Sequence, residues 1–326
     1  MIYVIKRIFT SVKKYREKAF ENNLFKALNT LKFASKDFDI TLIDIGAAGE
    51  IEPRWKSISR HLNYIGFEPD DRSRKLMRNN SSCSKYHIYP NAVWDSEAKI
   101  NINFTKVPQV SSFYNPNANF TRLFPSPSRF DVKEVISIEA VTLDSLKISN
   151  FDFIKIDIQG GELNVLKGAS ESLKNTLGLE IEVEFIDLYE NQPLFGDLTK
   201  FLKTKDLEFI DFMNLCRWER TSHNGFGQCV FGDALFLKSP EFMIENHKYD
   251  NLILSKYLGI CLVYNRFDLI DRLIYLSDEK FKLLLAPFSK SIIYFKKKYR
   301  KLIYLNKIFN VFLQLFLKNT RSFIHY

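Results

Sequence analysis

The 326-residue sequence predicts a doubly wound α/β fold, with a mostly parallel sheet that ends in an antiparallel hairpin. Three observations predict it. Apolar runs rich in β-forming residues alternate with segments of helical periodicity through residues 41–250. Glycines or acids directly follow several of these runs, and the last two runs have no helix between them. Hydrophobic content of 46% and charged content of 26% are ordinary for a globular protein, so the chain can bury a sizeable core.

Five strands are expected before the hairpin, with helical spacing in three of the intervening segments. The strands are 41–46, 63–68, 85–90, 151–157 and 178–185, and the helical segments lie near 54–61, 72–79 and 162–175. The hairpin is expected over 207–213 and 228–238. The interval 95–145, rich in Ser, Asn, Pro and Phe, is expected to be an insertion with short strands over the cleft. Ligands of such sheets bind outside the carboxyl ends of the strands.

The net charge of +9 is unevenly distributed along the chain. Residues 1–40 carry 9 basic and 4 acidic residues, and residues 251–326 carry 14 and 4. The middle carries 24 basic and 30 acidic residues, which disfavours nucleic acid as its partner. We therefore expect three parts: a basic amphipathic helical extension (1–36), the α/β domain (37–240) and a basic helical C-terminal extension (241–326).

The two basic ends combine cations with apolar residues at helical spacing. The N-terminal stripe comprises Ile5, Ile8, Val12, Tyr15, Ala19 and Leu24. In the C-terminal part, a helix pair is expected around Asn265 and Arg266, followed by the run KKKYRKLIYLNKIFNVFLQLFLK. Such segments bind anionic membrane surfaces, pack against a second copy of the chain as in a homodimer, or dock on the protein's own sheet. The sequence leaves these three alternatives open.

Cysteine and histidine usage argues against a disulfide scaffold or a structural zinc site. The four cysteines form no CxxC pair, and the five histidines form no HxxxH pair. The N-terminus lacks the apolar core of a signal peptide, and no window of 18 residues is apolar and free of charge. We expect a cytoplasmic protein, peripheral at the inner face of a membrane if the basic ends bind lipid.

The turn after the first strand indicates a nucleoside-type cofactor. Gly46 and Gly49 lie where the backbone must turn sharply, although such glycines are also typical of a plain tight connection. A dinucleotide fingerprint requires glycine at 48 and 51, which are Ala48 and Ile51, so a nicotinamide-dependent oxidoreductase is disfavoured. Glu68 ends the second strand, where an acid holds ribose hydroxyls. A ligand with a ribose but no diphosphate fits, and S-adenosylmethionine is such a ligand.

The stretch FDFIKIDIQGGELNVLKGA (151–169) indicates a strand, a tight turn and a helix. Its polar residues Asp157, Gln159 and Glu162 lie at the carboxyl edge of the sheet. Glu162 is also explained as a negative charge at a helix N-terminus, which stabilises a helix by about 0.3–1 kcal/mol. Gly160 and Gly161 keep the turn thin enough for a ligand to approach.

The strand LEIEVEF (179–185) places Glu180, Glu182 and Glu184 on one face by strict alternation. One interpretation is an ion-pair layer in which Lys155 neutralises Glu182. The other is chemistry at the carboxyl edge, which Glu184 is nearest to. Clustered carboxylates raise one another's pKa and suit a general base. They also suit a divalent metal, but the spacing does not demand one and no metal is expected.

Eight segments, in order, resemble the FkbM-type methyltransferases over roughly residues 41–240. They are IDIGAAGE, GFEPD, YPNAVWD, SSFYNPN, TLDSL, FIKIDIQGGELNVLKGA, EVEFIDLYENQPLF and GQCVFGDALFL. The resemblance implies the class I methyltransferase (Rossmann-like) fold and S-adenosylmethionine as the cofactor. It also implies methylation of hydroxyl groups on sugars, glycans and other secondary metabolites.

Carried over by position, the resemblance implies a set of cofactor-binding residues. Around the methionine end these are Asp44, Gly46, Ala47, Ala48 and Gly49. Glu68 takes the ribose with Pro69 shaping its turn, Asn91 and Ala92 lie near the adenine, and Asp157 lies beside the transferred methyl. The sequence departs from the common family pattern at Ala48, where Asn is usual, and at Gln159, where many members have Glu.

Methyl transfer to a hydroxyl requires a positioned base, and the expected catalytic residues are Asp157, Glu184 and Glu162, in that order. The expected acceptor contacts are Ser111, Ser112, Asn115 and Gln159. The expected function is S-adenosylmethionine-dependent O-methylation of a sugar, surface glycan or glycolipid. The alternative is a catalytically inactive binding or scaffold protein at a membrane surface. The sequence does not identify the acceptor or the hydroxyl.

Overall fold

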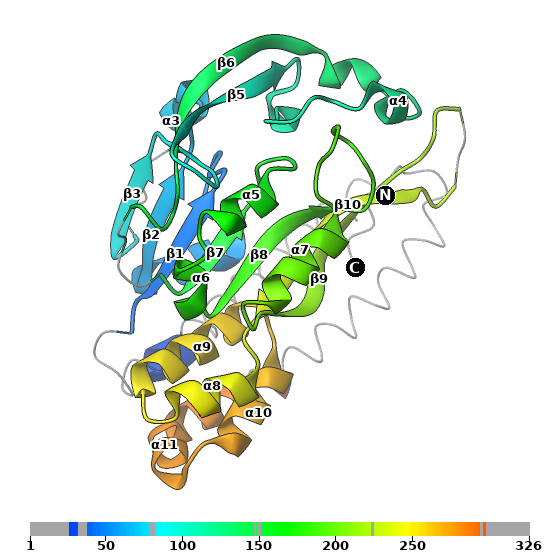
Figure 1. Ribbon diagram of the computed structural model, residues 1–326. Helices are drawn as coiled ribbons and strands as arrows, with labels where there is room; N and C mark the ends of the chain where they lie inside the picture. The colour runs from blue at the N-terminus through cyan, green and yellow to red at the C-terminus, as the bar shows by residue number, and fades with distance from the viewer. Residues whose placement is uncertain are drawn as a thin grey trace, which may run out of the picture. The chain divides into compact units, whose positions relative to one another are not determined.

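A computed structural model gives the protein a large sheet of seven strands, drawn in Figure 1. The model describes residues 26–31, 38–77, 82–146, 148, 151–222, 225–293 and 296–297. The spatial order of the strands is β3-β2-β1-β7-β8-β10-β9. Their bounds are β1 (Ile40–Ile45), β2 (Leu62–Phe67), β3 (Lys85–Tyr89), β7 (Phe153–Ile156), β8 (Gly178–Glu184), β9 (Glu208–Trp218) and β10 (Gln228–Leu237).

The register of the sheet confirms the predicted fold class. β2 runs parallel to β3, and β7 runs parallel to both β1 and β8. β10 runs antiparallel to β8 and to β9, so the sheet ends in the expected hairpin. Helices are present near both ends of the described chain, at residues 26–31 and from Pro240 onward. The polar ends of the parallel strands therefore meet at one edge, as the sequence predicts.

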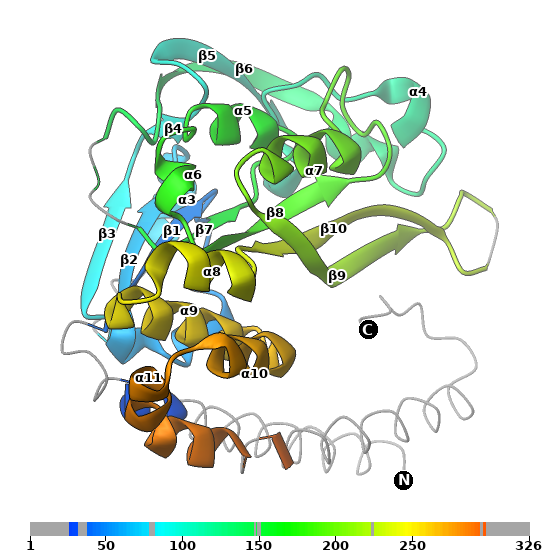
Figure 2. The same ribbon diagram turned by 60° about the horizontal axis from the view of Figure 1, so that its bottom comes forward.

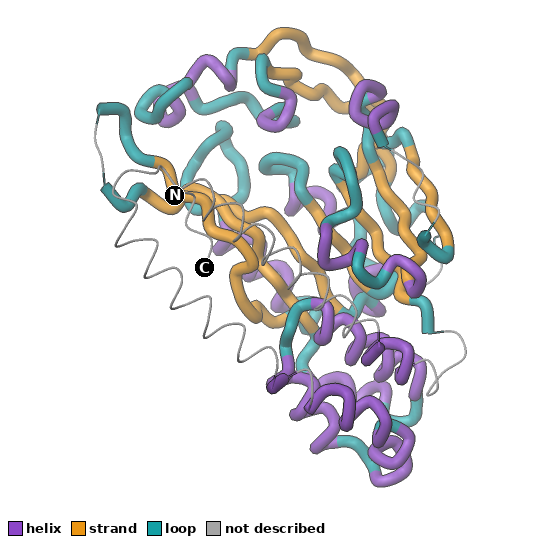
Figure 3. Tube along the Cα trace, turned by 180° about the vertical axis from the view of Figure 1, so that it is seen from behind, coloured by secondary structure: helices purple, strands orange, loops and turns teal. Residues whose placement is uncertain are grey.

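The expected insertion forms a second, three-stranded sheet. Its strands are β4 (Ala92–Val93), β5 (Ala98–Thr105) and β6 (Val132–Val141), in the order β4-β6-β5. Viewed from behind, the β5–β6 ladder stands apart from the large sheet (Figure 3). Between β5 and β6 lie one short α-helix and two 3₁₀-helices, namely η2 (Pro108–Val110), α4 (Ala118–Thr121) and η3 (Pro127–Phe130).

Helices cover one face of β8 and form the main core with it. They are α5 (Glu162–Lys167), α6 (Ser172–Asn175) and α7 (Phe195–Lys203), all visible on the same face in Figure 2. Leu179, Ile181 and Val183 of β8 pack with buried leucines and valines of α5 and α7. Alternation along β8 then turns Glu180, Glu182 and Glu184 to the other face. The helix α7 is not among the expected elements.

The described residues fall into two compact units. The sheet unit holds residues 40–50 and 63–239, and the helical unit holds residues 51–62, the described residues up to 39 and those from 240 onward. The remaining helices are α2 (Pro53–Lys56), η1 (Ser59–His61), α3 (Asp71–Leu76), α8 (Pro240–His247), α9 (Asn251–Val263), α10 (Phe267–Leu276) and α11 (Glu279–Leu284). The expected division at 36 and 240 stays a prediction.

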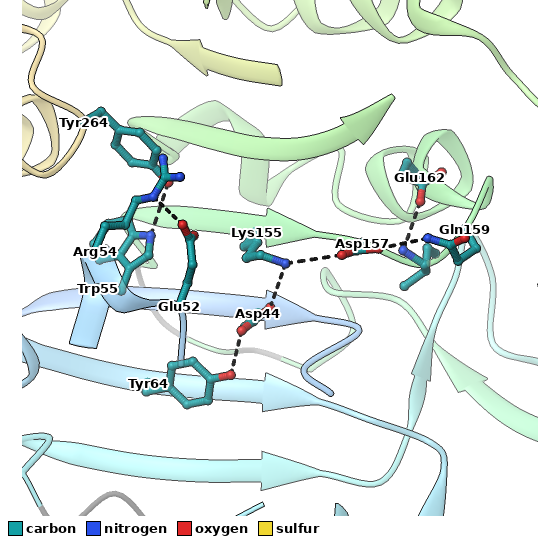
Figure 4. Close-up of polar contacts among 11 residues, drawn as sticks. Asp44, Glu52, Arg54, Trp55, Tyr64, Lys155, Asp157, Gln159, Glu162 and Tyr264 are labelled. Atoms are coloured by element: carbon teal, nitrogen blue, oxygen red, sulfur yellow. Dashed lines mark hydrogen bonds and ion pairs between the residues drawn. The ribbon is translucent and has the colours of Figure 1, made fainter. Parts of the chain in front are cut away.

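The helical unit contains the predicted helix pair. Asn265 separates α9 from α10 in a left-handed conformation (φ 58°), and Arg266 N donates a hydrogen bond to Cys261 O at 2.7 Å. Trp55 is buried and donates its indole N–H to Tyr264 Oη at 3.2 Å, and the Arg54 guanidinium lies over the Tyr264 ring (Figure 4). Trp55 is thus a core residue of this unit.

About half of the residues in the two basic ends lie outside the described residues. This applies to the stripe from Ile5 to Leu24 and to all residues after 297. In the described part of the chain, no helix combines the length and the hydropathy that crossing a membrane requires. All four cysteines are free.

Candidate active site

The turn after β1 requires glycine and lies against the end of β7. Gly46 has a φ of +82°, and a Cβ there would come within 2.0 Å of the Asp157 carbonyl oxygen. The N–H groups of Gly46 and Ala47 both donate to Phe67 O, at 3.0 and 3.1 Å, which joins this turn to the end of β2. Gly49 (φ +102°) has open space where its side chain would be. The turn is therefore fixed at one end and open at the other.

Asp44 is buried in β1 and is only partly satisfied. Tyr64 Oη donates to Asp44 Oδ2 at 2.7 Å, and Lys155 Nζ lies 4.0 Å from Oδ1 (Figure 4). Oδ1 has no hydrogen-bond partner among the described residues. Burial raises the pKa of Asp44, against the opposing effects of Lys155 and Tyr64. This oxygen is an acceptor that lacks a donor.

Glu68 lies directly after β2, next to the Gly46 turn. It is buried, and its Oε1 accepts a hydrogen bond from Asp70 N at 2.8 Å. Burial raises the pKa of Glu68 to about 6. Arg74 holds the backbone of this turn, because its Nη1 donates to the carbonyls of Glu68 (2.7 Å) and Pro69 (2.8 Å). An ionisable acid thus stands at the strand end where a ribose is expected.

The two residues expected near an adenine lie at the end of the next strand. Asn91 is half-buried just before β4, and Ala92 is a buried residue of β4 that pairs with Ala140 of β6. Glu68 N donates to Tyr89 O at 3.1 Å, which brings the end of β3 beside that of β2. The positions are adjacent along the sheet edge, and the role of Asn91 and Ala92 stays a prediction.

A charged row crosses three neighbouring strands of the sheet. The register sets Asp44 beside Lys155, and Lys155 beside Glu180. Lys155 Nζ also lies 3.7 Å from Asp157 Oδ2. Burial disfavours the charge on Lys155, but the Asp44 and Asp157 carboxylates outweigh it and raise the pKa of Lys155. Lys155 therefore neutralises this row, and it stands opposite Glu180, not Glu182 as the ion-pair interpretation requires.

The turn between β7 and α5 is held in an unusual conformation by side chains of β8, of the loop after β8 and of the insertion. Gln159 is left-handed, with a φ of 61°, which is uncommon for a residue with a side chain. Its Nε2 donates to Glu182 Oε2 at 2.5 Å and contacts Asp157 Oδ1 at 3.3 Å. Tyr189 Oη donates to Gln159 Oε1 at 3.2 Å, and Ser112 Oγ donates to its carbonyl at 2.6 Å. Strained backbone of this kind concentrates at functional sites.

Three carboxylates converge beside this turn, and we refer to Glu162, Glu182 and Glu184 as the acidic triad. One carboxylate oxygen of each lies within 4.8 Å of the others. Their exposed fractions are 1%, 7% and 1%. Burial and the neighbouring carboxylates raise all three pKa values, that of Glu162 to about 7. Glu162 also caps the turn, because its Oε1 accepts from Ile158 N at 3.0 Å.

Only some of the residues expected to contact an acceptor lie beside the acidic triad. The hydroxyl of Ser112 is buried, donating to the Gln159 carbonyl and accepting from Tyr114 N at 3.1 Å. Ser111 Oγ accepts from Thr105 N at 3.1 Å, and exposed Asn115 contacts Asn103. The structure therefore joins Ser112 and Gln159 to the carboxylates, whereas Ser111 and Asn115 bond within the insertion.

Three further residues of the site escaped the sequence analysis, namely Tyr64, Tyr189 and Gln192. Tyr64 supports Asp44, and Tyr189 supports Gln159. Gln192 is buried and accepts from Tyr189 N through its Oε1 at 2.6 Å. Alternation in NYIGFE places Tyr64 on the face of Glu68, which is a usable signal. No spacing rule connects Tyr189 or Gln192 to a turn 30 residues earlier.

The chain matches the methyltransferase FkbM domain family over residues 44–210, just over half of its length. Among solved structures it is similar to a methyltransferase FkbM from Methylobacillus flagellatus, with 16% identity and a TM-score of 0.37, covering 60% of this chain and 43% of that one. This chain therefore spans less than half the length of that protein. No curated protein matches.

Two other solved methyltransferases are similar at lower scores. One is the magnesium protoporphyrin IX methyltransferase of Synechocystis PCC 6803 with bound SAM, at 8% identity and a TM-score of 0.30, over 67% of this chain and 79% of that one. The other is the precorrin-6y C5,15-methyltransferase of Geobacter metallireducens, at 12% identity and a TM-score of 0.30, over 65% and 88%.

Proposed function

This chain belongs to the FkbM methyltransferase family, its cofactor is S-adenosylmethionine, and we propose that it methylates a hydroxyl of a sugar, a surface glycan or a glycolipid. The observation that carries the proposal is the position of Asp157. Its backbone lies against the Gly46 turn, and its carboxylate, 41% exposed, contacts Gln159 beside the acidic triad. An accessible acid thus stands between the cofactor turn and a cluster of polar groups.

The residues present fit this cofactor. Asp44 Oδ1 is a buried acceptor without a donor, which suits an ammonium group. Glu68 would accept hydrogen bonds from ribose hydroxyls, and the open space at Gly49 leaves room beside the turn. The hydrogen bond from Gly46 N to Phe67 O holds the ends of β1 and β2 together. Asp44 lies near the end of β1, and the other expected residues follow the two strands: Gly46, Ala47, Ala48, Gly49, Glu68 and Pro69. These residues could hold S-adenosylmethionine in the positions that they have in this structure.

The chain's own side chains would handle the proton of the acceptor. When bound, S-adenosylmethionine supplies an electrophilic methyl group. Asp157 would accept the proton of the attacking hydroxyl, a role that contributes roughly 10²–10⁴-fold in rate. Lys155 Nζ lies 3.7 Å from the Asp157 carboxylate, and the Gln159 amide restricts the orientation of that carboxylate. Ser112 of the insertion donates to the Gln159 carbonyl, and by holding that turn it would help to position the acceptor.

The charge distribution supports an acceptor at an anionic membrane surface. Residues 251–326 carry 14 basic and 4 acidic residues among large apolar side chains. A chain with such ends would approach a lipid-linked glycan from the cytoplasmic face. Packing of the same ends against a second copy is the alternative, and binding to vesicles with and without anionic lipid separates the two.

The test is transfer of labelled methyl from S-adenosylmethionine to a mixed pool of glycans and glycolipids. Asp157→Asn is compared with Asp187→Asn, a control at an exposed acid. We expect Asp157→Asn to lose about 100-fold or more in turnover while S-adenosylhomocysteine still binds. The label should resist mild base, as a methyl ether does. Full activity of Asp157→Asn, or label released by mild base as from an ester, would contradict the proposal.

A further inference from the structure

The acidic triad has no cation of its own. Among the described residues, no nitrogen of a lysine, arginine or histidine lies within 4.0 Å of these three carboxylates, and Lys155 is already paired with Asp44 and Asp157. An isolated buried charge is strongly unfavourable, so buried carboxylates are paired, protonated or bound to metal. Three buried carboxylates within 4.8 Å of one another must therefore be protonated, be paired with a cation or bind a metal ion.

Two buried atoms at the triad also lack a regular hydrogen bond. Glu184 Oε2 has no hydrogen-bond partner among the described residues, although the side chain is only 1% exposed. The Gln192 side chain lowers the pKa of Glu184 through a hydrogen bond, although the geometry at its Nε2 falls outside that of a regular hydrogen bond. Carboxylate oxygens with free lone pairs that gather in one buried place can coordinate a divalent cation.

The spacing of the three oxygens agrees with a coordination sphere. Three oxygens that lie no more than 4.8 Å apart can all be within about 2.8 Å of a common point. Ca²⁺ binds oxygen at about 2.3–2.6 Å, so an inward movement of a few tenths of an ångström would complete its contacts. Mg²⁺, which binds oxygen at about 2.0–2.1 Å, would need a larger movement of the long glutamate side chains. Two ligands come from β8 and one from the first residue of α5, so rigid elements hold all three.

We infer that Glu162, Glu182 and Glu184 bind one divalent metal cation through oxygen. The chemistry of the ligand set selects Mg²⁺, Mn²⁺ or Ca²⁺ over softer metals, because every donor is a carboxylate. The Gln192 amide would donate to a water or hydroxyl in the same coordination sphere.

The role of this ion rests on the proposed function, but its binding does not. Gln159 connects the triad to Asp157, since its amide donates to Glu182 Oε2 and contacts Asp157 Oδ1. A hydroxyl bound to the ion would be more acidic, and Asp157 would then take its proton. The ion would also fix two neighbouring hydroxyls of a sugar, which gives a reason for an acceptor of that class.

The test is binding of Mn²⁺ to the full chain after treatment with EDTA, measured by the loss of the free Mn²⁺ signal in electron paramagnetic resonance. Glu184→Gln and Glu182→Gln remove ligands without changing shape. Glu180→Gln is the matched control, a buried glutamate on the same face of the same strand but outside the triad. We expect one site per chain, affinity reduced about tenfold or more in both ligand variants, and no change in the control.

The outcomes for the metal and for the methyltransferase are separate. The inference would be overturned if the wild type has no saturable Mn²⁺ site and is not stabilised thermally by Mg²⁺ or Ca²⁺. The triad would then be neutralised by protonation. If Glu184→Gln and Glu182→Gln both bind Mn²⁺ with the affinity of the wild type, the site lies elsewhere and the inference is overturned as well. If one variant fails to fold, the wild type and the other variant still decide. Titration with S-adenosylhomocysteine in EDTA reports on the cofactor site independently.

Discussion

Two layers of carboxylates lie on the same large sheet, and they are neutralised differently. The first layer contains Asp44 and Asp157 with Lys155 between them, at 4.0 and 3.7 Å. The second layer is the acidic triad. Its Glu182 and Glu184 lie two and four residues beyond Glu180, which is level with Lys155, and no cation among the described residues pairs with them. The first layer has its own cation, and Asp44 Oδ1 is left as an acceptor for the cofactor. The second has no described cation and leaves Glu184 Oε2 without a hydrogen bond, so we assign metal binding to it, with Asp157 beside both layers.

The largest effect is expected from removing the cation of the first layer. Lys155→Met keeps the length of the side chain but leaves two carboxylates unpaired. We expect the free energy of unfolding at pH 7 to fall by about 3 kcal/mol, the lower end for a broken buried pair, because a fifth of the lysine side chain is exposed. Urea denaturation measures this change. A loss below about 1 kcal/mol would mean that the first layer is not held by its lysine.

A smaller loss is expected when a fourth carboxylate joins the second layer. Gln159→Glu removes the amide that donates to Glu182 Oε2 and adds a negative charge. We expect a destabilisation of about 1–2 kcal/mol at pH 7.5 in EDTA. Gln159→Met, which removes the donor without adding charge, isolates the first contribution. A glutamate variant as stable as the wild type would show that the triad tolerates further charge without a metal.

Removing a charge from the triad should have the opposite sign to Lys155→Met. In EDTA, Glu184→Gln deletes one of three crowded carboxylates and presents its own amide instead. We expect it to be at least as stable as the wild type, by up to about 1 kcal/mol in thermal unfolding. Glu180→Gln serves again as the control. A clear loss of stability in Glu184→Gln alone would contradict the view that this carboxylate lacks a partner in the metal-free chain.

Glu68 extends the comparison to a single buried carboxylate at the cofactor side. Burial raises the pKa of Glu68 to about 6, so folding favours the protonated side chain. The protonated side chain therefore contributes to the free energy of unfolding fully below its ordinary pKa of 4.5, and this contribution is lost as the pH rises through 6. Ribose hydroxyls donate to the ionised form. The affinity for S-adenosylhomocysteine should therefore fall about fourfold from pH 7.5 to 5.5.

Calorimetric titration measures this dependence on pH. Glu68→Gln is the control, because its affinity should be lower and independent of pH over that range. A wild-type affinity that does not change between the two pH values would separate Glu68 from the ribose.

The sequence predicts the frame of the site better than its internal contacts. Alternation and strand-end residues correctly place Asp44, Glu68 and Asp157 on neighbouring strand ends, because these patterns depend on local geometry. The pairing of Lys155 with Asp44 and Asp157 depends on the register between strands far apart in the chain, and a single sequence contains no direct signal for it. The interpretation that Lys155 neutralises Glu182 fails for this reason.

Contacts made by the insertion were equally beyond local patterns. The Ser112 hydroxyl is bonded to the Gln159 carbonyl, 47 residues later in the chain, and its contact with an acceptor stays a prediction. The helix α7 differs, because it begins at Phe195 within the Pro-Leu-Phe-Gly run, and Phe195, Leu198 and Leu202 recur at helical spacing. That spacing is a local signal that the sequence does contain.

The central claim is that the ends of β1 and β2 bind S-adenosylmethionine, and thermal unfolding tests it most directly. S-adenosylhomocysteine and NADH are each added to the wild type and to Glu68→Ala. At 100 times its dissociation constant, a specific ligand stabilises the folded chain by about 2.7 kcal/mol. We expect that stabilisation from S-adenosylhomocysteine alone, and its loss in Glu68→Ala at the same concentration. Stabilisation by NADH instead, or no effect of S-adenosylhomocysteine at saturating concentration, would contradict the account.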